Sequence, residues 1–150
     1  MIRDIFFRAK RRDHDGYWAY GYYAPISVSD SHGPQMAIVT IEPNEYMYMG
    51  YGGNLASPKF YTVDPNTVGQ AIGMVDKNGK QIFEGDICRF REWSRGEMCW
   101  IGKIHYEHRQ FLISGGPNKE CSSPFELAMS RFCSEDIEVI GNIYDNPGMI

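Results

Sequence analysis

The sequence has no long hydrophobic run and no excess of positive charge. Its longest uninterrupted apolar stretches, such as "MAIV" at 36–39, have only four residues, far below the roughly 18 residues that a membrane-spanning helix needs. The opening "MIRDIFFRAKRR" has too short an apolar run for a secretory signal, and charges interrupt it. The net charge of −4 argues against a general polyanion-binding protein, which is usually basic. We therefore expect a soluble, cytoplasmic protein without membrane contact.

Motifs of common catalytic and cofactor sites are also missing. The four cysteines include no C-x-x-C pair and match no zinc ribbon or finger. In a cytoplasmic protein we expect all four to be buried, reduced thiols, although Cys88 and Cys99 flank a predicted turn and can also face each other across a hairpin. No G-x-S-x-G motif or phosphate-binding loop occurs. We predict a protein that is not an enzyme and has no catalytic residue, cofactor or metal.

What the sequence does contain is turn chemistry between apolar runs. "IFFRAK" and Tyr17–Tyr23 flank the turn residues "RDHDG", which predicts an N-terminal hairpin. "DKNGK" predicts a second hairpin, in which Asn78-Gly79 supplies positive φ angles. Gly85, in "FEGDICRF", interrupts a strand and predicts a bend capped by Asp86.

Residues 24–58 form the least regular part of the sequence and are interpreted as an insertion. Within it, "YMYMGYGG" predicts a strand with Tyr46 and Tyr48 on one face and Met47 and Met49 on the other. A strand that is apolar on both faces must be covered on both, by its own fold or by another chain. Together with Tyr20 and Tyr22 of the hairpin arm, these residues are the predicted self-association surface.

The C-terminal half predicts a small barrel. Residues 82–144 indicate three strands, a helix over "SPFELAMSRF" (123–132) and a last strand from Ile137 to Tyr144. Ser123 as N-cap, Pro124 at the first helical position and Glu126 as capping-box partner favour the helix. The fold class is therefore mainly β and antiparallel: an N-terminal hairpin layer (1–81), a C-terminal SH3-like barrel (82–150) and one short helix, with an open sheet as the alternative.

Three groups of side chains are candidates for a functional site. Arginines around a tryptophan after "EGD" are candidate nucleic-acid contacts: Arg89, Arg91, Trp93 and Arg95. Glu84 and Asp86 are an acid–base pair if the bend projects both into a cleft, but a structural turn is favoured. His105 and His108 are interpreted as surface histidines at a hairpin end, because residues three apart on a strand point to opposite faces.

Three blocks resemble the YopX family. "IFFRAK", "VDPNTVGQAIGMVDKNGKQIFEGDI" and "IEVIGNIYDNPGMI" lie in the family's order at the start, middle and end of the chain. The departures are Lys10 and Ala71, where the family has aromatic residues, and the segment 24–58. The resemblance implies a mainly β protein encoded by a phage or prophage, without an activity or catalytic residue to transfer. The remaining matched residues have structural explanations as turn, bend and bulge positions: Asn78, Gly79, Gly85, Asp86, Gly141 and Asn142.

The functional expectation is a non-catalytic protein of a bacterial host's cytoplasm that self-associates or binds a host or phage protein. A homo-oligomer is the favoured assembly. Nucleic-acid binding through the arginine and tryptophan patch is the alternative.

Overall fold

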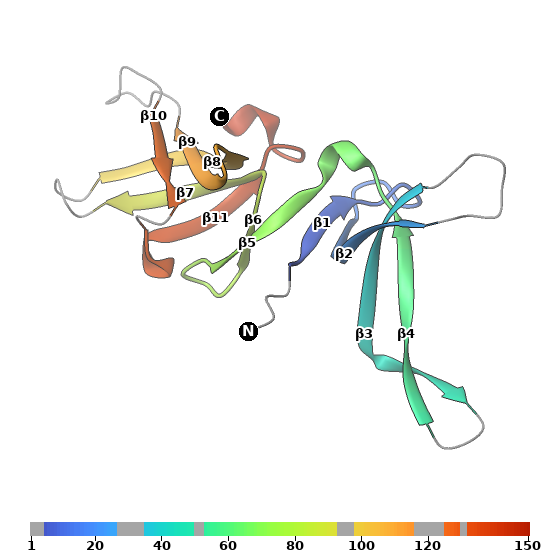
Figure 1. The fold of residues 1–150 in the computed structure, drawn as a ribbon. Coiled ribbons are helices and arrows are strands. Elements are labelled where there is room, and N and C mark those ends of the chain that lie inside the picture. The colour runs from blue at the N-terminus through green and yellow to red at the C-terminus, as the bar shows by residue number, and fades with distance from the viewer. Residues whose placement is uncertain (1–4, 27–34, 50–52, 93–97, 116–124, 130–131) are drawn as a thin grey trace. The chain divides into compact units, whose positions relative to one another are not determined.

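The computed structural model describes residues 5–26, 35–49, 53–92, 98–115, 125–129 and 132–150. Side chains are described throughout these ranges except at 41–49, 53–57, 92, 98 and 125–128. The chain forms two compact units, Met1–Gln70 and Ala71–Ile150 (Figure 1). The described residues form antiparallel strands and short 3-10 turns, which confirms the predicted mainly β class.

The first unit is an antiparallel sheet in the order β4-β3-β2-β1. The strands are β1 (Phe7–Lys10), β2 (Trp18–Ile26), β3 (Gln35–Met49) and β4 (Gly53–Thr62), and a 3-10 turn, η1 (Pro65–Thr67), follows. Figure 1 shows β3 and β4 running side by side as a long hairpin. On the far side of β1, Gly69 and Gln70 at the start of β5 (Gly69–Val75) pair with Arg8 and Phe7.

The first unit's core lies on one face of this sheet. Ala9 and Ala19 are opposite each other on β1 and β2 and are buried with Ile38 and Val63. A β-carbon at Gly21 would collide with the carbonyl oxygen of Val39, so only glycine allows the close approach of β2 and β3 there. The N-terminal hairpin predicted from "IFFRAK" and Tyr17–Tyr23 is present as β1 and β2.

The second unit contains a five-stranded antiparallel sheet in the order β10-β9-β8-β7-β11. Its strands are β7 (Asp86–Glu92), β8 (Met98–Glu107), β9 (Gln110–Gly115), β10 (Phe125–Ala128) and β11 (Ile137–Asn142). The remainder of β5 pairs with β6 (Gln81–Phe83), and two 3-10 turns, η3 (Ser134–Asp136) and η4 (Pro147–Met149), flank β11. No pairing of the described residues joins β10 to β11, so the sheet is open and the SH3-like closure is not formed by these strands.

Alternation along β7 builds the core of this unit. Cys88 and Phe90 point inward, and the Phe90 ring stacks on Trp100 with centroids 4.6 Å apart. Phe132 packs against both rings, at 5.2 Å from Phe90 and 5.6 Å from Trp100. Ile82, Ile104, Ile113, Met129 and Ile137 complete the buried cluster.

The helix predicted over 123–132 is wrong. Ser123 and Pro124 lie outside the described residues, but Phe125–Ala128 form strand β10, with Leu127 opposite Ile113 of β9. Two or three turns of isolated helix are marginal in water, whereas the edge of β9 offers a complete set of backbone partners. Met129 and Phe132 still reach the core, as the apolar pattern requires.

The predicted turns differ in their backbone conformation. Gly79 has a φ of 78° and donates its N–H to the Asp76 carbonyl at 2.9 Å, but Asn78 does not share the positive φ angle expected of it. Among the described residues, the non-glycine positions with positive φ are His108 (51°) and Arg109 (67°), in the turn between β8 and β9. This is the two-residue hairpin turn with positive φ at both central positions.

The bend at "EGD" is tied to the rest of its unit. Gly85 has a φ of 83°, donates its N–H to Ile104 at 2.9 Å and accepts from the Ile143 N–H at 2.9 Å. The Asp86 carboxylate accepts the Phe83 N–H at 2.8 Å and is 1% exposed.

Gly141 and Asn142, the predicted bulge and turn residues, lie at the end of β11. The register of β11 against β7 shifts between Val139 and Gly141, and a β-carbon at Gly141 would lie 2.6 Å from the Asn146 Oδ1. The side-chain oxygen of Asn142 accepts the backbone N–H groups of Tyr144 and Asp145 at 3.0 and 2.9 Å. The chain can therefore turn back on itself directly after the strand.

The prediction that all four cysteines are buried is partly wrong. Cys88 is in the core, but Cys99 and Cys133 are exposed, and Cys121 lies outside the described residues. Cys99 lies opposite Arg91, and Cys88 opposite Gly102, so the two do not face each other across the hairpin. The inward and outward faces of β7 and β8 explain the difference between Cys88 and Cys99, because only inward positions reach the core.

Candidate binding surfaces

The first unit presents aromatic side chains on the sheet face opposite its core. Trp18, Tyr20 and Tyr22 alternate with the inward residues of β2 and therefore share this face. Tyr22 lies opposite Val39, and Val39 opposite Phe60, so Phe60 joins the same row across three strands. Tyr20, Tyr22 and Phe60 are 52%, 41% and 55% exposed. We call the surface of Trp18, Tyr20, Tyr22 and Phe60 the aromatic face.

Two cations border the aromatic face on β1. Lys10 lies opposite Trp18, and Arg8 lies opposite Tyr20. The Arg8 guanidinium carbon is 4.8 Å from the Trp18 ring centroid, and the Lys10 Nζ is 5.8 Å from it, both within cation–π range. Arg8 is buried, at 4% exposure, whereas Lys10 is half-buried.

The predicted self-association surface is only partly visible. Tyr20 and Tyr22 are described and are exposed. The backbone of Tyr46–Met49 belongs to β3 and pairs with β4, as the strand prediction requires. The predicted side chains on this stretch lie outside the described ones: Tyr46, Met47, Tyr48 and Met49.

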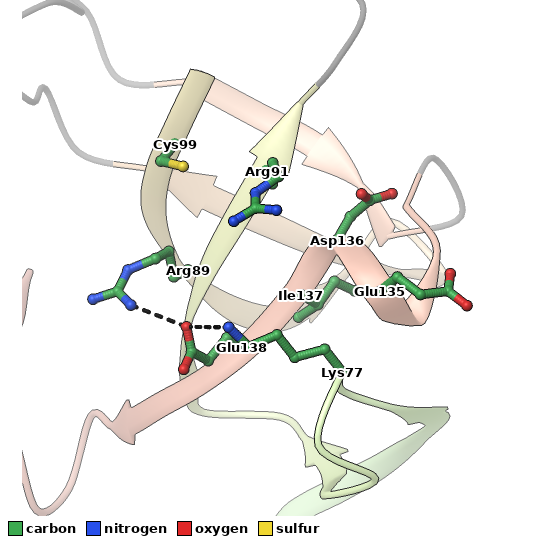
Figure 2. A pocket seen from close by; sticks show the side chains of 8 residues that line it. All are labelled: Lys77, Arg89, Arg91, Cys99, Glu135, Asp136, Ile137 and Glu138. Atoms are coloured by element: carbon green, nitrogen blue, oxygen red, sulfur yellow. Dashed lines mark hydrogen bonds and ion pairs between the residues drawn. The ribbon is translucent and has the colours of Figure 1, made fainter. Parts of the chain in front are cut away.

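A charged pocket occupies the outer face of the second unit's sheet (Figure 2). Its volume is about 120 Å³. It is lined by Lys77, Arg89, Arg91, Cys99, Glu135, Asp136, Ile137 and Glu138. The Glu138 carboxylate binds both the Lys77 ammonium at 3.0 Å and the Arg89 guanidinium at 2.9 Å, as the dashed lines in Figure 2 show. The hydrogen bond from Lys77, with a further contribution from Arg89, lowers the pKa of Glu138 despite partial burial.

The arginine candidates for nucleic-acid binding fall on this pocket. Arg89 and Arg91 are exposed on the outward face of β7, while Trp93 and Arg95 lie outside the described residues. Three carboxylates line the same pocket as the two arginines. The local charge is therefore mixed, so the nucleic-acid interpretation of this strand stays a prediction.

The carboxylates of the "EGD" bend are placed differently from an acid–base pair. Asp86 is buried and accepts a backbone N–H, whereas Glu84 accepts the Tyr106 N–H at 3.4 Å on the exposed side. A cleft that holds both carboxylates is what the acid–base hypothesis requires. Here one carboxylate is buried against the backbone and the other is on the exposed side, so the two do not meet that requirement.

The two histidines lie on different elements. His105 is on β8, with its Nε2 3.7 Å from Glu107 and its Nδ1 3.4 Å from the Ser114 hydroxyl. His108 is in the following turn. Within the described ranges no three His, Cys, Asp or Glu side chains gather as metal ligands.

Sequence reasoning missed part of the aromatic face. The alternation of Trp18, Tyr20 and Tyr22 is visible in "YWAYGYYA", and it is the signal for a one-sided aromatic strand. Phe60, Arg8 and Lys10 are missed because they join the face only through the register of β4 and β1 against their neighbours. Register depends on tertiary pairing, which a single sequence does not encode locally.

The fold defines an all-β protein built from open antiparallel sheets. A profile of the YopX protein family matches residues 7–150. The chain therefore belongs to the YopX family, as its three sequence blocks indicate.

The crystal structure of protein EF1440 from Enterococcus faecalis is similar at 20% sequence identity, covering 97% of this chain and 96% of that chain with a TM-score of 0.49. A search of the curated proteins finds no match. In the described part of the chain, no helix is long and apolar enough to cross a membrane.

Proposed function

We propose that this YopX-family chain is a non-catalytic, phage- or prophage-encoded binding protein. It acts in the cytoplasm of a bacterial host, through contact of the aromatic face with a macromolecular partner. One observation carries the proposal: exposed rings of β2 and β4 lie in register on either side of Val39 of β3, on the sheet face away from the core. Single exposed apolar residues are common on protein surfaces, but a contiguous row marks an interaction site.

Self-association and partner binding both use such a surface. A second copy of the chain, a host or phage protein and a nucleic acid are the partners to distinguish. The arginines of β7 are not the basis of the proposal, because the Arg89 guanidinium is bound by the Glu138 carboxylate, which also binds Lys77. A catalytic role for Glu84 and Asp86 is not its basis either, because the Asp86 carboxylate accepts the backbone N–H of Phe83.

The proposal is tested by measuring molar mass with size-exclusion chromatography and light scattering, with and without single- and double-stranded DNA. We expect a mass above that of one chain in at least one condition. Tyr20→Ser combined with Tyr22→Ser should return it to the mass of one chain. Both rings are substantially exposed, so their removal should cost little stability.

Tyr106→Ser is the matched control, because Tyr106 is 52% exposed, as Tyr20 is, but lies on the second unit. It should leave every measured mass unchanged. A mass of one chain for the unmodified protein in all conditions, together with no protein partner captured on it, would overturn the proposal, and so would an equal effect of the control.

A further inference from the structure

The aromatic face combines flat rings with positive charge. Lys10 and Arg8 lie beside the Trp18 ring, and Tyr20, Tyr22 and Phe60 extend the apolar surface from there. None of the described side chains on this side of β1–β4 is acidic, although the whole chain carries a net charge of −4. The charged side chains described on this face, Lys10 and Arg8, are therefore both basic.

This charge distribution discriminates between occupants. In a symmetric contact of two copies, Lys10 and Arg8 occur on both sides, and the described side chains of this face supply no carboxylate to either copy. An anionic partner that also offers flat apolar surfaces complements both features. A single strand of nucleic acid does so, since its phosphates are charged and its unpaired bases can stack on aromatic rings. A duplex keeps its bases stacked inside and offers no such surface.

We propose that the aromatic face binds single-stranded nucleic acid. Bases stack on Tyr20, Tyr22 and Phe60, and the half-buried Lys10 pairs with a phosphate. The buried Arg8 contacts the Trp18 ring and positions it at the end of the row. This inference rests on the proposed function and names the partner of that same surface.

The test is fluorescence anisotropy of a labelled oligothymidylate of about 15 nucleotides, which suits a single small binding site. The unmodified protein should bind it more tightly than a duplex of the same length. The combined Tyr20→Ser and Tyr22→Ser variant should weaken binding about tenfold or more, because each lost stacking contact reduces affinity several-fold. Circular dichroism of the variant checks that its sheets are intact, and Tyr106→Ser should bind like the unmodified protein.

Charge is tested separately from stacking. Lys10→Gln should reduce the slope of log affinity against log salt by about 0.7, the value for one phosphate contact on a single strand. Lys103→Gln, an exposed lysine on β8 of the second unit, is the matched control and should leave the slope unchanged. Inorganic polyphosphate carries the charge without bases, so it should compete at least about tenfold more weakly per phosphate than oligothymidylate.

The outcomes separate this inference from the proposed function. A face-dependent oligomer that binds no oligothymidylate would overturn the inference and leave the proposed function standing. Binding that survives the tyrosine variant but is lost in Arg89→Ala with Arg91→Ala would place nucleic acid on the second unit and overturn the inference. Equal binding of polyphosphate and oligothymidylate would show a charge effect without stacking, which also contradicts it.

Discussion

Asp76 shows how one carboxylate fixes a turn. Its Oδ1 accepts the backbone N–H groups of Asn78 and Lys80 at 2.8 and 2.9 Å, and its Oδ2 accepts the Val139 N–H at 3.0 Å. The side chain is only 2% exposed. Burial alone raises the pKa, but the hydrogen bonds from Val139, Lys80 and Asn78 outweigh it and leave the pKa of Asp76 below its ordinary value. The β5–β6 turn is thereby attached to the edge of β11.

Replacing this carboxylate should destabilise the second unit strongly. Asp76→Ala leaves three backbone N–H groups without their acceptor, and we expect the free energy of unfolding to fall by about 3 kcal/mol. Urea unfolding followed by circular dichroism measures the change. Glu135→Ala, an exposed carboxylate of the same unit, should change stability by less than about 0.5 kcal/mol. An equal effect of both variants would contradict the role of Asp76.

The same group gives the stability a pH dependence with a defined sign. Because the pKa of folded Asp76 lies below the ordinary 3.8, its contribution is complete above that value and is lost as the pH falls through the folded pKa. The stability difference between the unmodified protein and Asp76→Ala should therefore be largest at about pH 6 and shrink below about pH 3. A difference that grows on acidification would contradict this assignment.

At the scale of the elements, the hairpin turns show what a sequence predicts and what it does not. Asn78-Gly79 and Gly85 mark turns through local chemistry, and both turns are present. His108 and Arg109 occupy a turn with positive φ, where asparagine followed by glycine is the usual pair, so the pairing of β8 with β9 dictates that conformation. The "SPFELAMSRF" segment is the converse case, where a local capping signal is overridden by the free edge of β9.

The strained turn predicts a stabilising substitution. His108→Asn combined with Arg109→Gly places residues that tolerate positive φ at both positions, and we expect the free energy of unfolding to rise by about 1 kcal/mol. Chemical denaturation measures the gain. Arg109→Ala keeps a β-carbon at a φ of 67° and should give no such gain. Unchanged or lower stability of the double variant would show that the turn is not strained.

At the scale of the whole molecule, composition alone points away from nucleic acid, because the net charge is −4. In the structure the charges are distributed unevenly. The charged side chains described beside the aromatic face are both basic, whereas carboxylates line the pocket around Arg89. Tyr20 and Tyr22 could be chosen from the sequence, but the neighbouring Lys10 and Phe60 could not. Which residues share a surface depends on strand register, whereas net charge is a sum over all surfaces.

The most direct test of the central claim is where a bound single strand touches the chain. Ultraviolet cross-linking to an oligothymidylate, followed by mass spectrometry of the tryptic peptides, reports that position. Our account predicts adducts on β2, at Trp18, Tyr20 or Tyr22, and their loss in the Tyr20→Ser, Tyr22→Ser variant. Adducts confined to the Arg89–Arg91 strand, or no adducts on the unmodified protein, would contradict it.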